Sequence, residues 1–277
     1  MIKIDSLTNS IQECELPDGT GTRQVGFGLE NRKTVGAGAP TDNETAIKMT
    51  GFGSTALSTK LSDRMLAEER GIAQSAAVYA AGTSPFHVRG SVYQGAMAHA
   101  DQHVPGGLRR VREACTDPAL AEFVGQSFNS TGWYDVLPME PLSGVIAELL
   151  GLEKNEYLEQ RTREHATRDL VGLYRLLIRA VSARTVALFF AKLSTRYYDW
   201  GSMEARLRGP RRVQTVRSGV PGPVLDWYST VTCSFSEAAL EIAGAPGPRV
   251  VPSSCEPDGT RFGVATYAMK FDVTWEA

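Results

Sequence analysis

Residues 157–201 read YLEQRTREHATRDLVGLYRLLIRAVSARTVALFFAKLSTRYYDWG, and this stretch decides the fold that the sequence predicts. Its apolar residues recur at spacings of three and four, which is the period of an amphipathic helix. Ser182 has the short hydroxyl side chain that N-cap positions favour. We therefore predict two consecutive helices that meet near Ser182 and end before Gly201.

Beyond Gly201 the apolar period changes from 3.6 to 2, which indicates strands. Residues 203–208 and 213–217 flank Gly209-Pro210 and predict a hairpin, residues 224–232 and 236–243 predict two short helices, and residues 249–253 predict a strand. Pro257-Asp258-Gly259-Thr260 is typical of a hairpin turn. The final strand alternates most clearly, and the residues expected on its core face are Ala265, Tyr267, Met269, Phe271, Val273 and Trp275.

On the N-terminal side, helices are expected from about Val88, over residues 108–114, from Asp117-Pro118, and after Met139-Glu140-Pro141 up to Gly151. The predicted fold class is α+β, with a helical bundle over residues 86–200 followed by a β-β-α-β-β antiparallel sheet over residues 201–277. Together they form one expected domain, residues 84–277.

Residues 1–83 form a Gly- and Thr-rich extension, irregular except for a possible helix at 55–81. Its first 54 residues contain too few long aliphatic side chains to offset the entropy of ordering them alone. This arm is therefore either flexible or held against a surface of its own domain, another protein or another copy of the chain, and we expect the second.

The composition excludes several classes of partner. With 29 basic and 31 acidic residues, the chain has no overall charge that would attract nucleic acid or an anionic membrane. It contains no apolar run of about 18 residues and no secretory signal at Met1, so we expect no membrane span. The four cysteines are scattered without a C-x-x-C pair, which favours the cytoplasm.

Several stretches resemble, in order, an uncharacterised paralogous family of myxobacterial proteins over residues 86–277. They are Val88-Arg89-Gly90-Ser91-Val92, Trp133-Tyr134-Asp135-Val136-Leu137-Pro138, Gly209-Pro210, Leu240-Glu241-Ile242-Ala243-Gly244-Ala245 and the strand ending at Trp275.

The arrangement that this resemblance implies is similar to sensor folds of the haem nitric-oxide-binding and vinyl-reductase type. A haem-binding sensor of that type carries a Tyr-x-Ser-x-Arg clamp, whereas Tyr228-Ser229-Thr230-Val231-Thr232 lacks the arginine. We therefore predict no cofactor, and in particular no haem.

His99 and His103 lie four residues apart on a predicted helix, so both imidazoles could face one metal ion. The glutamate of an H-E-x-x-H motif is missing, and histidines in a last helical turn also interact favourably with the helix dipole. His165 and Asp169 are spaced as an ordinary surface pair.

Five arginines, which suit phosphate or carboxylate, cluster on the first predicted hairpin: Arg206, Arg208, Arg211, Arg212 and Arg217. They predict a site for an anion or an acidic partner, or they protect an exposed sheet edge from aggregation. No aromatic platform accompanies them, so specific nucleic-acid binding is not expected.

Aromatic and apolar residues at element ends give a candidate ligand pocket between the bundle and the sheet: Tyr197, Trp200, Trp227, Tyr267, Met269 and Phe271. Aromatic residues in such places also serve as core anchors.

Three functions remain open from the sequence, and no catalytic residue is predicted. The leading hypothesis is a non-catalytic interaction, assembly or regulatory protein that works through residues 1–83. The second is a small-molecule sensor with an apolar ligand in the predicted pocket. The third is a metal-dependent hydrolase at His99 and His103.

Overall fold

A computed structural model describes residues 79–169 and 182–277 of the chain, all within one compact unit. Most of the predicted N-terminal arm, residues 1–78, lies outside the described residues. The first part contains β1 (His87–Arg89), α3 (Gly90–His103), α4 (Gly107–Ala114), α5 (Pro118–Phe123), β2 (Trp133–Asp135), α6 (Met139–Leu150), α7 (Lys154–Asp169) and α9 (Ala183–Tyr197). The second contains β3 (Ser202–Gly209), β4 (Arg212–Pro221), the 3-10 helix η2 (Gly222–Val224), α10 (Leu225–Ile242), β5 (Arg249–Arg261) and β6 (Val264–Thr274).

The predicted α+β class and the β-β-α-β-β order are confirmed. Ser182 caps α9, because its hydroxyl oxygen accepts a hydrogen bond from the Thr185 amide at 3.2 Å. The two helices expected between residues 224 and 243 are one helix, α10. Ser234 does not interrupt it, since its hydroxyl bonds the Thr230 carbonyl one turn earlier at 2.9 Å.

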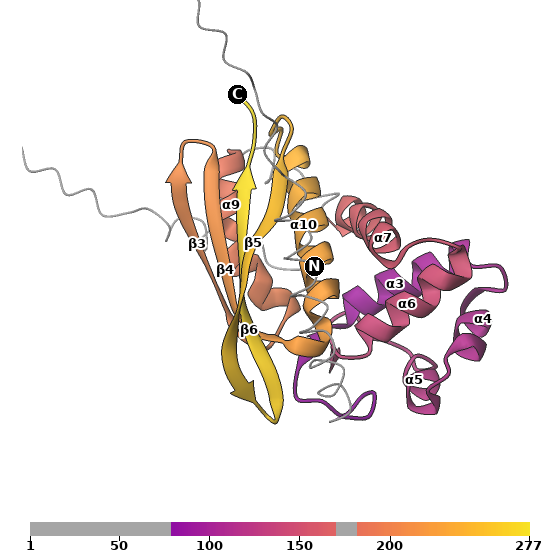
Figure 1. Cartoon of the computed structure of the whole chain (residues 1–277). Helices are drawn as coiled ribbons and strands as arrows, with labels where there is room; N and C mark the ends of the chain where they lie inside the picture. The colour runs from indigo at the N-terminus through magenta and orange to yellow at the C-terminus, as the bar shows by residue number, and fades with distance from the viewer. Residues whose placement is uncertain (1–78, 170–181) are drawn as a thin grey trace, which may run out of the picture. The chain divides into compact units, whose positions relative to one another are not determined.

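The four main strands form an antiparallel sheet in the order β3-β4-β6-β5. Helix α9 covers β3 and β4 while α10 covers β5, and α7 packs on α10 away from the sheet (Figure 1). On the helix-covered face, the buried side chains of β4 and β6 are paired across the ladder: Val213 with Val273, Thr215 with Phe271 and Arg217 with Met269.

The last hairpin turns later than the sequence predicts. Phe262 and Gly263 form the turn, both with positive φ, at 52° and 77°. This is the geometry of tight hairpins, and glycine adopts it without strain. The predicted turn at residues 257–260 is a bulge inside β5. Its Pro and Gly are compatible with a bulge as well as with a turn.

The buried side of β6 changes along the strand. Met269, Phe271 and Val273 are buried as predicted, but Ala265 and Tyr267 are only half-buried while Val264 and Thr266 are buried. Irregular pairing in both neighbouring strands accompanies this change, after Arg217 in β4 and after Pro257 in β5. Bulges bend strands and increase their twist, which turns the other side of β6 toward the protein.

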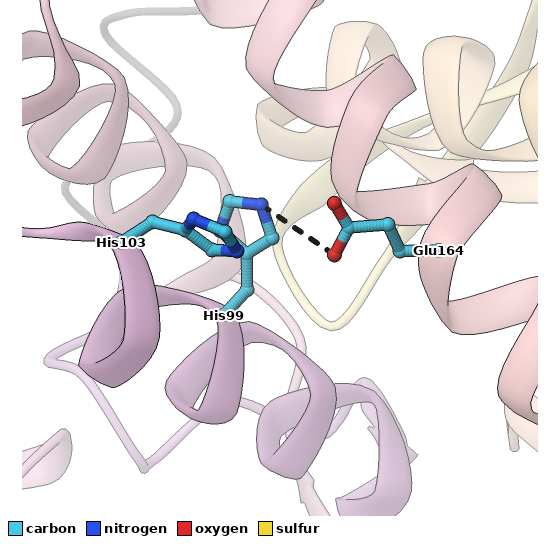
Figure 2. A group of neighbouring side chains, drawn as sticks. All are labelled: His99, His103 and Glu164. Atoms are coloured by element: carbon cyan, nitrogen blue, oxygen red, sulfur yellow. Dashed lines mark ion pairs between the residues drawn. The ribbon is translucent and has the colours of Figure 1, made fainter.

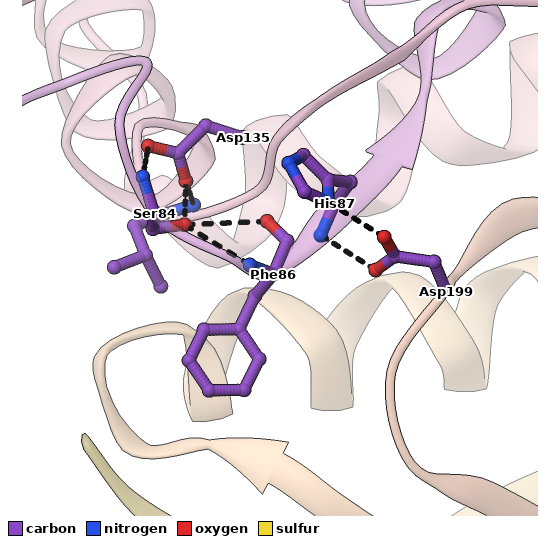
Figure 3. A network of polar contacts seen from close by, with 6 residues as sticks. Ser84, Phe86, His87, Asp135 and Asp199 are labelled. Atoms are coloured by element: carbon purple, nitrogen blue, oxygen red, sulfur yellow. Dashed lines mark hydrogen bonds and ion pairs between the residues drawn. The ribbon is translucent and has the colours of Figure 1, made fainter. Parts of the chain in front are cut away.

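Two short strands that the sequence does not predict hold the start of α3 in place. β1 pairs antiparallel with β2, and the buried Asp135 carboxylate accepts hydrogen bonds from Gly82, Ser84 and Leu137 amides at 2.9, 3.1 and 2.9 Å. It also accepts a bond from the Ser84 hydroxyl (Figure 3). On the other side of β1, both the backbone and the ring of His87 bond Asp199. β1 thus joins the helical part to the end of α9.

Among residues 79–169 and 182–277, no helix combines the length and hydropathy that crossing a lipid bilayer requires.

Candidate functional site

A small cavity of about 70 Å³ lies where α7, α9 and α10 meet. The side chains that line it come mostly from these three helices: Val92, Arg161, Thr162, His165, Phe190, Leu193, Ser194, Tyr197, Tyr198, Met203, Tyr228, Val231, Thr232, Phe235 and Ser236. From the sheet only Met203 of β3 lines the cavity, so the cavity lies mainly among the helices and not on the inner sheet face that the sequence predicts.

A second, wider hollow of about 990 Å³ opens among α3, α4 and α5. Its charged side chains include Arg109 and Glu113, which pair with each other at 3.0 Å. None of its described lining residues has a buried polar atom that lacks a hydrogen-bond partner. The smaller cavity has such atoms and is therefore the better candidate.

Helix α7 provides the polar side of the cavity. Arg161 is only 2 % exposed, and its guanidinium donates one hydrogen bond, to the Val92 carbonyl at 3.3 Å. Its Nε and the buried Thr162 hydroxyl have no hydrogen-bond partner among the described residues. No described carboxylate forms an ion pair with Arg161, so its buried charge has no ionic partner among the described residues.

His165 completes this polar side, one turn after Arg161 on α7. A Cβ atom on Gly95 would lie 2.8 Å from its Nδ1. The glycine therefore allows α3 to approach the imidazole closely, because no other residue would fit without a shift.

Helices α9 and α10 provide the apolar side. Phe190 and Leu193 come from α9, Val231 and Phe235 from α10. The Tyr197 and Phe235 rings meet edge to face with centroids 6.0 Å apart, a geometry that aromatic pairs prefer. The cavity thus has an aromatic and aliphatic wall facing a cationic one.

A second buried arginine lies behind the α9 wall. Arg217, 1 % exposed, donates to the Ser194 hydroxyl at 3.1 Å and to the Trp200 carbonyl, and its guanidinium stacks 4.6 Å from the Trp200 ring centre. Like Arg161, it has no carboxylate partner among the described residues. Stacking on tryptophan partly compensates this charge, which distinguishes it from Arg161.

Tyr198 lies within the electrostatic reach of both arginines. Burial raises the pKa of Tyr198 well above its usual value, against the lowering influence of the Arg217 and Arg161 guanidinium groups. Burial likewise raises the pKa of Tyr228, the phenol on the facing helix. Both phenols are therefore neutral hydrogen-bonding groups at physiological pH.

Of the six residues predicted to form a pocket, only Tyr197 lines this cavity. Trp200, Trp227, Met269 and Phe271 are buried core residues, and Tyr267 is half-buried on β6. The predicted position on the inner sheet face is filled because α9 and α10 pack directly onto it.

The arginine hairpin divides into two groups. Arg206, Arg208, Arg211 and Arg212 are exposed, and three of them contact Glu204, Gln214 and Asp272 at 2.7, 2.8 and 3.2 Å. Arg217 does not belong with them, since alternation along β4 points it to the helix-covered face. The prediction that all five form one surface is wrong for Arg217, and binding by the other four stays a prediction.

His99 and His103 are brought together as predicted, and a carboxylate that the sequence pattern did not identify joins them. The centres of the two imidazole rings lie 4.4 Å apart, and both residues belong to α3. Glu164 of α7 lies beside them, with its Oε2 3.9 Å from His99 Nε2 (Figure 2). One ligand atom from each of the three residues lies within 4.8 Å of the others. His99 is buried, whereas His103 and Glu164 are exposed.

The fold can be compared with solved structures, although no protein-family model and no curated protein matches the sequence. A point mutant of the T. Tengcongensis H-NOX domain matches 68% of this chain and 98% of its own, with 9% identity and a TM-score of 0.50. A Cs H-NOX mutant carrying 4-cyano-L-phenylalanine matches 68% and 97% respectively, with 8% identity and the same TM-score of 0.50. The resemblance to a myxobacterial family finds no support in these matches.

The prediction that the protein has no cofactor, with haem excluded, is contradicted by these matches. A further matched structure, at 9% identity, 68% and 94% coverage and a TM-score of 0.49, comes from a study of haem distortion in the H-NOX family. At this identity the likeness to the two H-NOX mutants shows the fold alone, and that fold is the α+β arrangement of an H-NOX domain.

Proposed function

We propose that this protein is a small-molecule sensor that takes a short organic acid into the cavity among α7, α9 and α10. The observation that carries this proposal is the buried Arg161 guanidinium, which lines an otherwise largely apolar cavity without a carboxylate partner among the described residues. An isolated buried charge costs several kcal/mol, by order of magnitude. A bound acid would offset that cost.

The ligand class follows from the two walls. A guanidinium binds a carboxylate through two parallel hydrogen bonds, and the adjacent Thr162 hydroxyl can donate a third. Phe190, Leu193, Val231 and Phe235 would surround an apolar tail. A cavity of about 70 Å³ has room for only a few heavy atoms, since one water needs roughly 10–15 Å³ by the same measure.

Haem, which the neighbouring family suggests, matches the residue types but not the volume. His165 could supply an imidazole, Arg161 a cation for a propionate, and the aromatic wall a stacking surface. A cavity of about 70 Å³, however, is far below the roughly 300–1,000 Å³ of pockets for drug-sized ligands. The cavity is therefore too small for haem, and hemin is a separate arm of the test.

The test uses the full chain and a series of straight-chain carboxylic acids from two to eight carbons. Calorimetry and thermal shift should detect one acid per chain, with no response to the amide of equal length. Arg161→Met should abolish binding, whereas Arg163→Met, an exposed site on the same helix, should leave it unchanged. Val231→Phe should reduce the chain length of the longest acid that binds.

Two results would overturn the proposal. One is the absence of any saturable response across the series, or a response that Arg161→Met leaves intact. The other is stoichiometric hemin binding with a Soret band that His165→Ala removes, which would make haem the ligand in place of a short acid.

Partner binding through the N-terminal arm stays a prediction, because residues 1–78 lie outside the described residues. The fold favours the sensor over the interaction hypothesis, since two solved structures that match the chain, both at a TM-score of 0.50, are H-NOX domains.

A further inference from the structure

The contact between the end of α3 and the middle of α7 gathers three side chains that commonly bind metal ions. His99 and His103 come from successive turns of α3, and Glu164 reaches them from α7 (Figure 2). None of the three residues lines the cavity of the proposed acid site.

The geometry is close to that of a bound ion. Metal–ligand distances of about 2.0–2.2 Å place the ligands of a tetrahedral ion roughly 3.3–3.5 Å apart. His99 Nε2 and Glu164 Oε2 are already 3.9 Å apart, and the widest separation in the group is below 4.8 Å. His103 and Glu164 are exposed and have the rotamer freedom to close the remaining gap.

His99 is buried, so its neighbours fix the position of the imidazole. The Tyr157 ring packs edge to face on the imidazole at 5.5 Å and holds its orientation.

We propose that His99, His103 and Glu164 form a site for a divalent transition-metal ion of the zinc class, which links α3 to α7. Two imidazoles and one carboxylate suit zinc or cobalt, whereas calcium and magnesium prefer oxygen ligands alone. With three protein ligands, the fourth position belongs to water.

One neighbour competes for the carboxylate. Arg168 pairs with Glu164 at 3.2 Å from the following turn of α7. An ion must draw Glu164 away from this partner and also meets the repulsion of the guanidinium. Arg168→Ala should therefore bind the ion more tightly than the unaltered protein, a change that a purely structural role of the three residues would not produce.

The experiment titrates zinc into the full chain after dialysis against EDTA, and repeats the titration with cobalt. Calorimetry should give one site per chain, and cobalt should give the visible absorption of a tetrahedral ion. His103→Ala and Glu164→Gln, both exposed, should each weaken binding by more than about tenfold.

The matched control is His87→Ala, because His87 pairs with Asp199 outside the group. This variant should bind zinc as the unaltered protein does. The circular dichroism spectrum of each metal-free variant should match that of the unaltered protein. The proposal is overturned by the absence of a stoichiometric site, by binding that survives both His103→Ala and Glu164→Gln, or by its loss in His87→Ala.

Discussion

Replacing Arg161 with methionine should make the ligand-free protein more stable. The change removes a guanidinium that is 2 % exposed and has no carboxylate partner among the described residues. Such a charge carries a penalty of several kcal/mol, while its bond to the Val92 carbonyl returns about 1.5–3 kcal/mol. The difference is a gain of about 1–3 kcal/mol, or roughly 2–12 °C in Tm at about 2–4 °C per kcal/mol for a chain of this size.

Arg163→Met is the matched control on the same helix. Arg163 pairs with Glu237 and Glu241 at 2.8 and 3.0 Å while its side chain is 44% exposed. Exposed pairs contribute about 0–1 kcal/mol each, so this substitution should leave stability unchanged or lower it slightly. The two arginines, two residues apart, should thus respond in opposite directions.

Thermal and urea unfolding of both variants, without added ligand, measure this contrast. If Arg161→Met is less stable than Arg163→Met, the buried guanidinium stabilises the ligand-free fold. It is then not an uncompensated charge that binds an acid. If Arg161→Met is more stable than the unaltered protein but no longer binds acid, then Arg161 lowers stability and is required for binding, as at many functional sites.

Two further predictions concern other buried groups. Asp135→Ala leaves the amides of Gly82, Ser84 and Leu137 without an acceptor. We expect this substitution to lower the free energy of unfolding in urea by about 3–5 kcal/mol, and Asp135→Asn to lower it by about half as much. A loss below about 1 kcal/mol for Asp135→Ala would contradict this account. Burial raises the pKa of Cys233 to about 12, so at pH 8 only about one thiol in ten thousand is ionised. Iodoacetamide should label the exposed Cys255 in the native protein and Cys233 only in urea, and equal labelling in peptide maps would refute the burial argument.

The sequence predicts those parts of the fold that local signals control. The helix after Ser182 and the β3–β4 hairpin follow directly from apolar period and turn residues, whereas residues 170–181 of the helix predicted before Ser182 lie outside the described residues. β1 and β2 were missed because each has three residues, too few to show alternation, and their pairing spans more than 40 positions. The late turn at Phe262 was missed because Pro257-Asp258-Gly259-Thr260 carries a stronger local turn signal.

The site was harder to predict, because its residues are combined only by tertiary packing. His99 and His103 share one helix and could be paired from their spacing, but Glu164 follows 61 positions after His103 and gives no local sign. Arg161 did carry a usable signal. It follows Leu158 by three residues and so occupies the apolar stripe of α7, where a charged side chain is out of place.

The docking of β1 on Asp199 has a consequence for how the chain acquires its structure. The His87–Asp199 contacts join residues 112 positions apart, and the Ser84–Asp135 contacts join residues 51 apart. Closing such long loops is slow, because the chain loses conformational entropy before the stabilising contacts form. During synthesis, the docking of β1 on Asp199 must therefore wait until the end of α9 has emerged, so the first of the described strands is among the last elements to be completed.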